Sequence, residues 1–597
     1  MSGLAYRARL LGPQTSLTLR ISPVSVAKLT LCLAICVSSA PALAGDAAAG
    51  RSVFQQQCSI CHTAARGDHG GAQGPSLIGV FGRRAAGDST FSYTRALRDA
   101  RLTWDAATLD RFLASPSTIV PGTAMPVAVA DHAQRGNLIA YFASLAASAA
   151  QPQAASAPST PGEPAAALGA ASAAEAADWR KDHPGRLHHI DVATLPPLYA
   201  SALARNPPKL VERPADAQLS LPTGFHVAVF GANFDGPRKM LVAANGDILL
   251  SEIDGGRVTV LRPAADNGGV ASRTVFAQGL KRPFGLAFFP DAGHPQWLYV
   301  AQTNRVVRYA YTTGDLSARG EPEIVAVLPD TGGHSTRDIV FSPNGRRLFV
   351  SVGSGSNIAE SMPKKTPDEI RRWEAQHGLG AAWGRETNRA AVLVFELGSK
   401  RPGRLFATGL RNCVSLTRQP VTGDLWCTTN ERDNLGDDLV PDYSTRVKQG
   451  AFYGWPWYYL GANEDPRLRG DRPDLQTHVT VPDVLYQSHS APLGLTFYTA
   501  TGGASAFPAE YVGDGFVTFH GSWNRDLRTG HKIVRMRMHG GAPTGDYEDF
   551  LTGFIVDDGN AWGRPVCTAE LADGSLLMSD DGAGLIYRIS YAPGIPP

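Results

Sequence analysis

The segment Cys58-Ser59-Ile60-Cys61-His62 has the C-x-x-C-H spacing that attaches haem covalently. Each thiol can add across a vinyl group of haem, and the adjacent histidine then meets the iron. Met125, in the loop 121–126, can supply a thioether on the opposite face. His/Met ligation raises the reduction potential and leaves no open site, which favours electron transfer over oxygen chemistry. We therefore predict a haem c with His62 and Met125 as iron ligands; the alternative is that Met125 only packs.

The segments that must position this haem are amphipathic. Apolar residues recur at intervals near 3.6 in residues 47–57, 105–113 and 133–145, which predicts three helices. Residues 45–148 are therefore expected to form an all-α haem domain.

Residues 1–44 have the pattern of an export signal. Basic residues precede an apolar run at 29–37, and Ala42-Leu43-Ala44 resembles a cleavage site. The run is too short to span a bilayer, and no other apolar run is long enough for a membrane span. Because haem c is attached outside the cytoplasm in bacteria, we predict a periplasmic protein with no membrane span once the signal is removed.

The chain of 597 residues is too long for one core, so two or more domains are expected. Its net charge of +2 does not suggest a nucleic-acid partner. Residues 149–178 are rich in Ala, Pro and Ser and lack an apolar face, which indicates a linker. Residues 179–218 are polar and interrupted by prolines, and we expect them to wrap onto the next domain.

Three cysteines, Cys413, Cys427 and Cys567, lie outside the leader and the haem motif. An oxidising compartment would allow Cys413 to pair with Cys427 across a hairpin. The alternative, given equal weight, is three unpaired buried thiols.

Short apolar strands separated by Gly, Asp and Asn turns recur in six units between residues 219 and 591. The units begin near Met240, Gly285, Ile339, Val414, Leu495 and Val566. Repeated multi-strand units predict an all-β six-bladed propeller over residues 219–597, with the strand 225–230 completing the last blade. A β-sandwich is the alternative.

Polar residues stand just before the first strand in three of these units. His334 precedes the third unit, Arg411 the fourth and Arg564 the sixth. A histidine can accept a proton near neutral pH, and a buried arginine can bind an anion. Each could instead be structural, as a packing histidine or an ion pair. Three such residues at equivalent positions converge on the propeller axis, which predicts a site there.

The loop Asn430 to Asp438 gathers oxygen donors around a glycine, a composition that suits Ca²⁺. Its spacing is not that of an EF-hand, and a solvated acidic loop is an equal alternative.

Residues 45–148 resemble the mitochondrial-type class I cytochromes c. The motifs that recur in family order are Cys58 to His62, Gly74 to Leu77, Phe81 to Arg83, Phe91 to Thr94, Leu102 to Trp104 and Pro121 to Met125. The resemblance implies that Arg83, Tyr93 and Trp104 lie around the haem propionates. Members of this family dock partners through a ring of lysines, whereas this segment contains no lysine.

The propeller resembles the sorbosone dehydrogenase and soluble glucose dehydrogenase family, whose members bind pyrroloquinoline quinone (PQQ) and Ca²⁺. The motifs are Gly333-His334 with Arg337, Leu410 to Asn412, Glu431 to Asp438, Tyr453 to Pro456 and the Arg564 loop.

The resemblance assigns roles to individual residues. It implies that His334 is the general base, that Arg411 contacts the quinone oxygen and that Asn412 lies beside it. The backbone carbonyls of Glu431 and Arg432 would coordinate Ca²⁺. Arg564 and Arg525 would pair with PQQ carboxylates, and Arg337 is assigned to the same cofactor.

Two positions depart from the family. Where the glucose enzymes have an acid near the base, this chain has Ser354, so the orientation of His334 is in question. The lysine that binds PQQ in those enzymes has no clear match, and Arg525 or Asn524 is the substitute.

Together these features predict a periplasmic quinohaemoprotein. A sugar, a sugar-derived aldehyde or a related alcohol is oxidised at PQQ, and electrons leave singly through haem c to a cytochrome or a terminal oxidase. One alternative is a propeller hydrolase or lactonase with its metal in the acidic loop. The other is a non-catalytic propeller tethered to an electron carrier.

Overall fold

The computed structural model describes residues 45–58, 62, 64, 74–88, 91, 93–123, 125, 127–149, 178–330, 332–399 and 401–594. The expected export signal, Cys61 and most of the linker lie outside these residues. Within the described parts, no helix is both long and apolar enough to cross a membrane.

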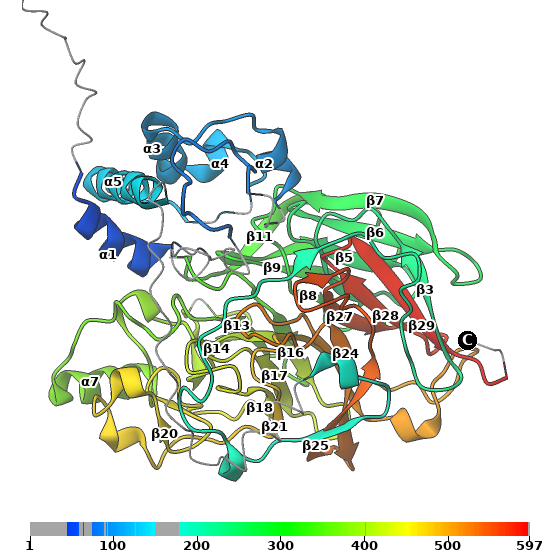
Figure 1. The fold of residues 1–597 in the computed structure, drawn as a ribbon. Helices are drawn as coiled ribbons and strands as arrows, with labels where there is room; N and C mark the ends of the chain where they lie inside the picture. The colour runs from blue at the N-terminus through cyan, green and yellow to red at the C-terminus, as the bar shows by residue number, and fades with distance from the viewer. Residues whose placement is uncertain are drawn as a thin grey trace, which may run out of the picture. The chain divides into compact units, whose positions relative to one another are not determined.

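The haem domain is helical (Figure 1). Its described helices are α1 (Ala47–Gln57), α2 (Arg95–Asp99), α3 (Ala106–Ala114), α4 (Pro116–Ile119) and α5 (His132–Ala149). Asp46 caps α1 and Asp105 caps α3 by accepting backbone N–H groups of the first turn. A Cβ on Gly50 would lie 1.9 Å from the Asn137 carbonyl oxygen, so glycine is required where α1 packs on α5. The three predicted helices are therefore confirmed.

The propeller has six blades, each built on four antiparallel strands (Figure 1). Blades one to three are β4 (Pro237–Val242), β5 (Ile248–Glu252), β6 (Arg257–Pro263) and β7 (Val270–Gln278); β8 (Leu286–Phe289), β9 (Trp297–Gln302), β10 (Arg305–Ala310) and β11 (Arg319–Val327); and β12 (Ile339–Phe341), β13 (Arg347–Val352), β14 (Ala391–Glu396) and β15 (Arg404–Thr408).

Blades four to six complete the ring. Their strands are β16 (Cys413–Arg418), β17 (Leu425–Thr429), β18 (Asp442–Arg446) and β21 (Val484–Tyr486); β22 (Pro492–Phe497), β23 (Gly515–Phe519), β24 (Lys532–His539) and β25 (Ala542–Leu551); and β27 (Pro565–Glu570), β28 (Leu576–Asp580), β29 (Leu585–Tyr591) and β3 (Phe225–Gly231). The first strand of the propeller therefore pairs with the last, from Phe225 opposite Tyr591 to Gly231 opposite Ile586, and closes blade six as predicted.

Phe225 anchors this closing strand. Its ring meets those of Phe507, Tyr511 and Phe550 at centroid distances of 4.8, 5.2 and 5.1 Å. We expect Phe225→Ala to lower the free energy of unfolding of the propeller by about 3–5 kcal/mol, because it leaves a cavity in this aromatic cluster. Denaturant unfolding followed by tryptophan fluorescence measures the change.

Val229→Ala is the matched control, because Val229 lies on the same strand and is 46% exposed. It should change the free energy of unfolding by no more than about 0.5 kcal/mol. Equal losses from both substitutions would show that Phe225 does not anchor the closure.

The segment before the propeller packs on its outer edge. Strand β1 (Leu187–His189) adds a fifth strand to blade five, and β2 (Lys209–Leu210) pairs with β26 (Asn560–Ala561). The buried Lys532 ammonium lies 3.0 Å from Asp182 of this segment and 2.7 Å from Asp549 of β25, which ties the two parts together.

Two insertions extend the blades. Residues 353–390, between β13 and β14, carry the helix α7 (Pro367–His377) and return to blade three beside the pocket described below. Blade four carries the hairpin β19 (Tyr458–Tyr459) and β20 (Asn463–Glu464).

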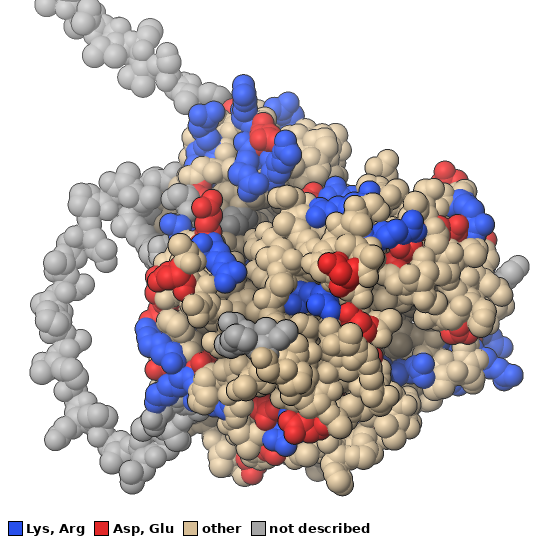
Figure 2. Space-filling view, turned by 90° about the vertical axis from the view of Figure 1, so that its right-hand side faces the viewer, with Lys and Arg blue, Asp and Glu red and all other residues tan. Residues whose placement is uncertain are grey.

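Cys413 of β16 and Cys427 of β17 form a disulfide, which resolves the alternatives left by the sequence. Cys567 is a buried free thiol. On the propeller face that Figure 2 draws, basic and acidic side chains are interspersed rather than separated by sign.

Candidate functional site

The strand order of the blades places polar residues at one end of the propeller. In an antiparallel meander, the start of the first strand and the turn between the second and third strands lie at the same end. A pocket there is lined from all six blades. Its polar residues include Arg238 and Asp254 (blade one), Arg282 (two), His334 (three), Arg411, Asn412, Glu431 and Asp442 (four), His489, His520 and Asn524 (five), and Arg564 and Asp581 (six).

His334 is held in one tautomer. Its backbone N and its ring Nδ1 both lie 3.0 Å from the carbonyl oxygen of Ser354. Because a carbonyl oxygen only accepts, Nδ1 carries the proton and Nε2 is left unprotonated. Among the described residues, none hydrogen-bonds to Nε2. Burial, and next the Arg411 guanidinium, lower the pKa of His334 well below 6.5, so the ring is neutral at physiological pH. Ser354 therefore orients this histidine without a carboxylate.

The turn behind His334 is tightly built. A Cβ on Gly353 would lie 2.7 Å from the Cβ of His334 and 2.3 Å from Oδ1 of Asn412, so glycine is required for this approach. The buried Arg389 donates hydrogen bonds to the carbonyl oxygens of Gly353 (3.1 Å), Ser354 (3.0 Å) and His334 (3.2 Å). The Ser354 carbonyl and the Arg389 guanidinium together fix the position of the His334 imidazole.

Arg411 and Asn412 project from the start of β16. The Arg411 guanidinium donates to the Glu431 carbonyl at 2.6 Å and to Asp433 at 3.0 Å. Asn412 and Asn524 each have a buried Oδ1 atom with no described hydrogen-bond partner. Unpaired buried oxygens are costly, so both atoms are suited to a ligand that donates to them or to a cation.

The acidic loop after β17 offers backbone and carboxylate oxygen atoms, the donor type that Ca²⁺ prefers. The Glu431 carbonyl accepts from Arg411, and no described residue donates to the Arg432 carbonyl. Nearby, Asp442 accepts the N–H groups of Glu431 and Ala491, at 2.8 Å each. Burial raises the pKa of Asp442 to about 8, with the charges of Glu431 and Asp433 contributing. These oxygens are of the type that a divalent cation prefers as ligands.

The Arg432 side chain anchors this loop and pairs with the Glu431 carboxylate at 3.0 Å. Its buried guanidinium donates to the carbonyls of Pro456 and Tyr458 and pairs with Asp465 at 3.2 Å. Only the backbone of Arg432 is thus available to a cation.

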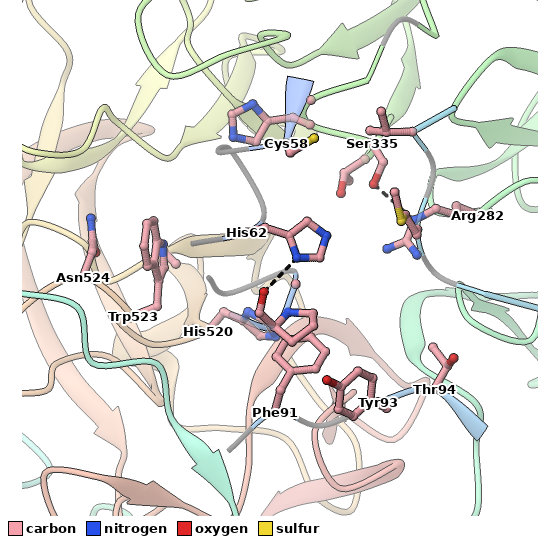
Figure 3. Close-up of a pocket in the computed structure, with 18 of the residues that line it drawn as sticks. Cys58, His62, Phe91, Tyr93, Thr94, Arg282, Ser335, His520, Trp523 and Asn524 are labelled. Atoms are coloured by element: carbon pink, nitrogen blue, oxygen red, sulfur yellow. Dashed lines mark hydrogen bonds between the residues drawn. The ribbon is translucent and has the colours of Figure 1, made fainter. Parts of the chain in front are cut away.

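Basic residues line the pocket on blades one, two and six. Arg238 pairs with Asp581 at 2.7 Å. Arg282 donates to Ser335 Oγ at 3.2 Å, and Figure 3 labels both residues. Arg564 makes one weak side-chain bond, from Nε to the His520 carbonyl at 3.4 Å, and its terminal nitrogens have no described partner. A guanidinium whose terminal nitrogens lack protein partners can bind a carboxylate ligand with two parallel hydrogen bonds.

Two predicted ligands of PQQ do not reach this pocket. The buried Arg337 guanidinium donates to the carbonyls of Pro329, His334 and Thr336. Arg525 donates to Ser488 and Leu527 carbonyls and pairs with Asp438 at 2.8 Å. Neither guanidinium lines the pocket, and each bonds instead to backbone or carboxylate oxygens, so the structure gives both arginines a structural role. Asn524, the other substitute for the missing lysine, does line the pocket.

The haem-domain residues are arranged as a haem site requires. His62 Nδ1 donates to the Pro75 carbonyl at 2.8 Å, which leaves Nε2 for iron (Figure 3). A largely apolar hollow is lined by Cys58, His62, Leu77, Val80, Arg83, Tyr93, Trp104, Leu109, Phe112 and Met125. The site therefore fits a haem with His62 and Met125 available as iron ligands.

The sequence also held site residues that we did not predict. Arg238, Arg282 and His489 occupy, in blades one, two and five, the position at or before the first strand that His334, Arg411 and Arg564 occupy elsewhere. Inspecting the position at or before the first strand in every blade would have identified these three residues. His520 and Asp581 lie in turns between second and third strands, a second set of positions at the same end.

Comparison with known proteins agrees with this architecture. The family model described as TrAA12-like matches residues 219–449 and 469–592. An uncharacterised protein of Borreliella burgdorferi is 27% identical over 386 residues, 62% of this chain and 91% of that protein. Cytochrome c of Tetrahymena pyriformis is 44% identical over 102 residues, 17% of this chain and 90% of that protein. The chain therefore belongs to the TrAA12-like family through its propeller and to the cytochrome c family through its N-terminal domain.

Solved structures share the propeller fold. The PQQ domain of pyranose dehydrogenase from Coprinopsis cinerea is 21% identical, with a TM-score of 0.50 over 64% of this chain and 99% of that one. The calcium structure of a carbohydrate-active family AA12 enzyme from Trichoderma reesei is 19% identical, with a TM-score of 0.51 over 64% of this chain and 99% of that one. The predicted combination of a cytochrome c domain and a six-bladed propeller is confirmed.

Proposed function

We propose that this chain is a periplasmic quinohaemoprotein dehydrogenase. It oxidises a sugar, a sugar-derived aldehyde or a related alcohol in the propeller pocket, with PQQ and Ca²⁺. Electrons then leave singly through haem c to an external acceptor, a cytochrome or a terminal oxidase. Residues 1–44 are the export signal, 45–148 the haem domain, 149–218 the linker and connecting segment, and 219–597 the catalytic propeller.

One observation carries the proposal: among the described residues, none hydrogen-bonds to Nε2 of the neutral His334 or to the terminal nitrogens of Arg564, and both side chains line the same pocket. When bound, PQQ supplies the hydride acceptor. Arg564 would bind a carboxylate of the cofactor, Arg411 and Asn412 would contact its quinone, and the Glu431 and Arg432 carbonyls would hold Ca²⁺. His334 Nε2 then takes the proton of the substrate hydroxyl while Ser354 keeps the ring oriented.

The names of related proteins support a carbohydrate substrate. The structures that share the fold include a pyranose dehydrogenase PQQ domain and a carbohydrate-active enzyme, and the family model matches the same propeller. The cytochrome c relatives support electron transfer as the purpose of the second domain. A tether between the two raises the local concentration of haem, so no diffusing carrier is needed for the first transfer.

Haem absorbance tests the proposal. Protein reconstituted with PQQ and Ca²⁺ is mixed with aldoses, aldehydes and alcohols, and reduction of the haem is followed. We expect reduction by at least one sugar or aldehyde, and none when PQQ is omitted. An oxidised haem with every substrate class would refute the proposal, and ester or lactone hydrolysis in the same samples would favour the hydrolase alternative.

Arg564→Met should weaken PQQ binding about 10- to 100-fold, since a charge-assisted hydrogen bond contributes about 1.5–3 kcal/mol. Calorimetric titration of the PQQ-free protein with PQQ in the presence of Ca²⁺ measures the dissociation constant. Arg401→Met, at an exposed arginine of blade three, is the control and should leave the constant unchanged. An unchanged constant for Arg564→Met would remove this residue from the cofactor site.

A further inference from the structure

A second histidine of the pocket, His520, is supported by a carboxylate. Its Nε2 lies 2.7 Å from Oδ1 of Asp581 (Figure 3 draws His520). An ionised carboxylate can accept hydrogen bonds but cannot donate them. The Nε2 atom of His520 therefore carries the proton, and its Nδ1 atom is unprotonated. Among the described residues, none hydrogen-bonds to Nδ1. Asp581 is fixed in turn by Arg238, whose Nη2 lies 2.7 Å from Oδ2.

His334 and His520 differ in their charged surroundings. The charges acting on His334 are those of Arg411, Arg389 and Arg337, all positive. The groups facing His520 are the Asp581 carboxylate in direct contact, Arg564, Arg238 and the neutral His531.

An adjacent carboxylate stabilises the imidazolium that forms when a histidine takes a proton. Burial, and next Arg564, lower the pKa of His520 to about 4, while Asp581 opposes that fall. The Asp581 carboxylate stays ionised, because Arg238 and His520 hold its pKa well below the usual range. Unlike His334, His520 therefore has a counter-charge for a bound proton. The third pocket histidine, His489, lies 3.8 Å from Asp433, but Asn524 donates to its Nδ1 and its Nε2 donates to the Gly436 carbonyl.

The proposed reaction requires a second proton acceptor. Oxidation of R₂CHOH to R₂C=O releases two electrons and two protons. One proton leaves the hydroxyl group for His334. The other hydrogen leaves carbon with the electron pair, and when both electrons have passed singly to haem iron, its proton remains in the pocket. Two protons must therefore leave in each turnover, and His334 accounts for one of them.

We propose that His520, paired with Asp581, is the catalytic residue that accepts this second proton. The inference rests on the proposed function and adds a residue to it. His520 Nδ1 takes the proton, and the Asp581 carboxylate balances the resulting charge. The reductant is the substrate, the electron acceptor is haem iron, and the proton passes from His520 to solvent.

The tautomer can be measured without turnover. Long-range ¹H–¹⁵N spectra of histidine-labelled protein without PQQ should show the His520 proton on Nε2, and Asp581→Asn should lower the His520 pKa. A proton on Nδ1 in the wild-type protein, or a pKa unaffected by Asp581→Asn, would overturn the assignment.

Stopped-flow kinetics separates the two steps. In His520→Gln we expect substrate to reduce PQQ at the wild-type rate while haem reduction slows about 100-fold, with partial recovery in added imidazole. His539→Gln, at an exposed histidine of the same blade, should match the wild type. Haem reduction within twofold of wild type, or equal loss of both phases in folded protein, would overturn the inference. Failure of the wild-type protein to reduce its haem would instead refute the proposed function.

Discussion

Replacing His334 with glutamine should slow substrate-driven haem reduction about 10²- to 10⁴-fold, the usual contribution of a general base. The Nε2 atom of His334 has no described partner, and the Ser354 carbonyl holds the ring in the tautomer that can accept a proton. Glutamine keeps much of the side-chain volume but cannot take a proton at neutral pH. Reduction by dithionite should be unchanged, because it does not pass through the propeller pocket.

His294→Gln serves as the control, since His294 is an exposed histidine of blade two. The pH profile gives a second readout. The pKa of His334 is lowered, so the unprotonated base persists as pH falls through 6.5, and the acid limb of the wild-type rate should lie below that value. Wild-type rates in His334→Gln would remove this residue as the base.

Replacing Met125 with alanine should lower the reduction potential of the haem by on the order of 100 mV, because axial ligation controls the potential. Met125 lines the apolar hollow that also contains His62, on a loop rather than a helix. Without the thioether, the iron gains an open position and should bind imidazole or cyanide readily. Spectroelectrochemical titration and ligand binding measure both effects.

Met362→Ala is the matched control, at a half-buried methionine of the propeller, and should leave the haem spectrum and potential unchanged. If Met125→Ala left the potential unaltered and the iron closed to ligands, Met125 would be the packing residue of the alternative interpretation.

The parts of the fold that could be predicted are those with local patterns. The alternation of apolar strands and turns predicted the six blades. The strand that begins at Phe225 belongs to none of the six repeats, which predicted that it closes the ring by completing blade six. His334, Arg411 and Arg564 could be predicted because a position before a first strand has a fixed place in a propeller. Their convergence follows from topology rather than from any long-range contact.

Arg337 and Arg525 show where this reasoning stops. Each stands beside a site motif, yet its guanidinium bonds to oxygens outside the pocket: neighbouring carbonyls for Arg337, and the distant Ser488 carbonyl and Asp438 carboxylate for Arg525. The His520–Asp581 pair is the converse case. Its members lie on different blades, and no local pattern joins them, so only the assembled ring brings the imidazole to the carboxylate.

The central claim is that the propeller oxidises substrate and the haem of the same chain receives the electrons. The most direct measurement is the rate of haem reduction after protein loaded with PQQ and Ca²⁺ meets a saturating sugar, repeated over a wide range of protein concentration. Intramolecular transfer predicts a first-order rate constant that does not change with protein concentration. A haem that stays oxidised while PQQ is reduced, or a rate constant proportional to protein concentration, would contradict the account.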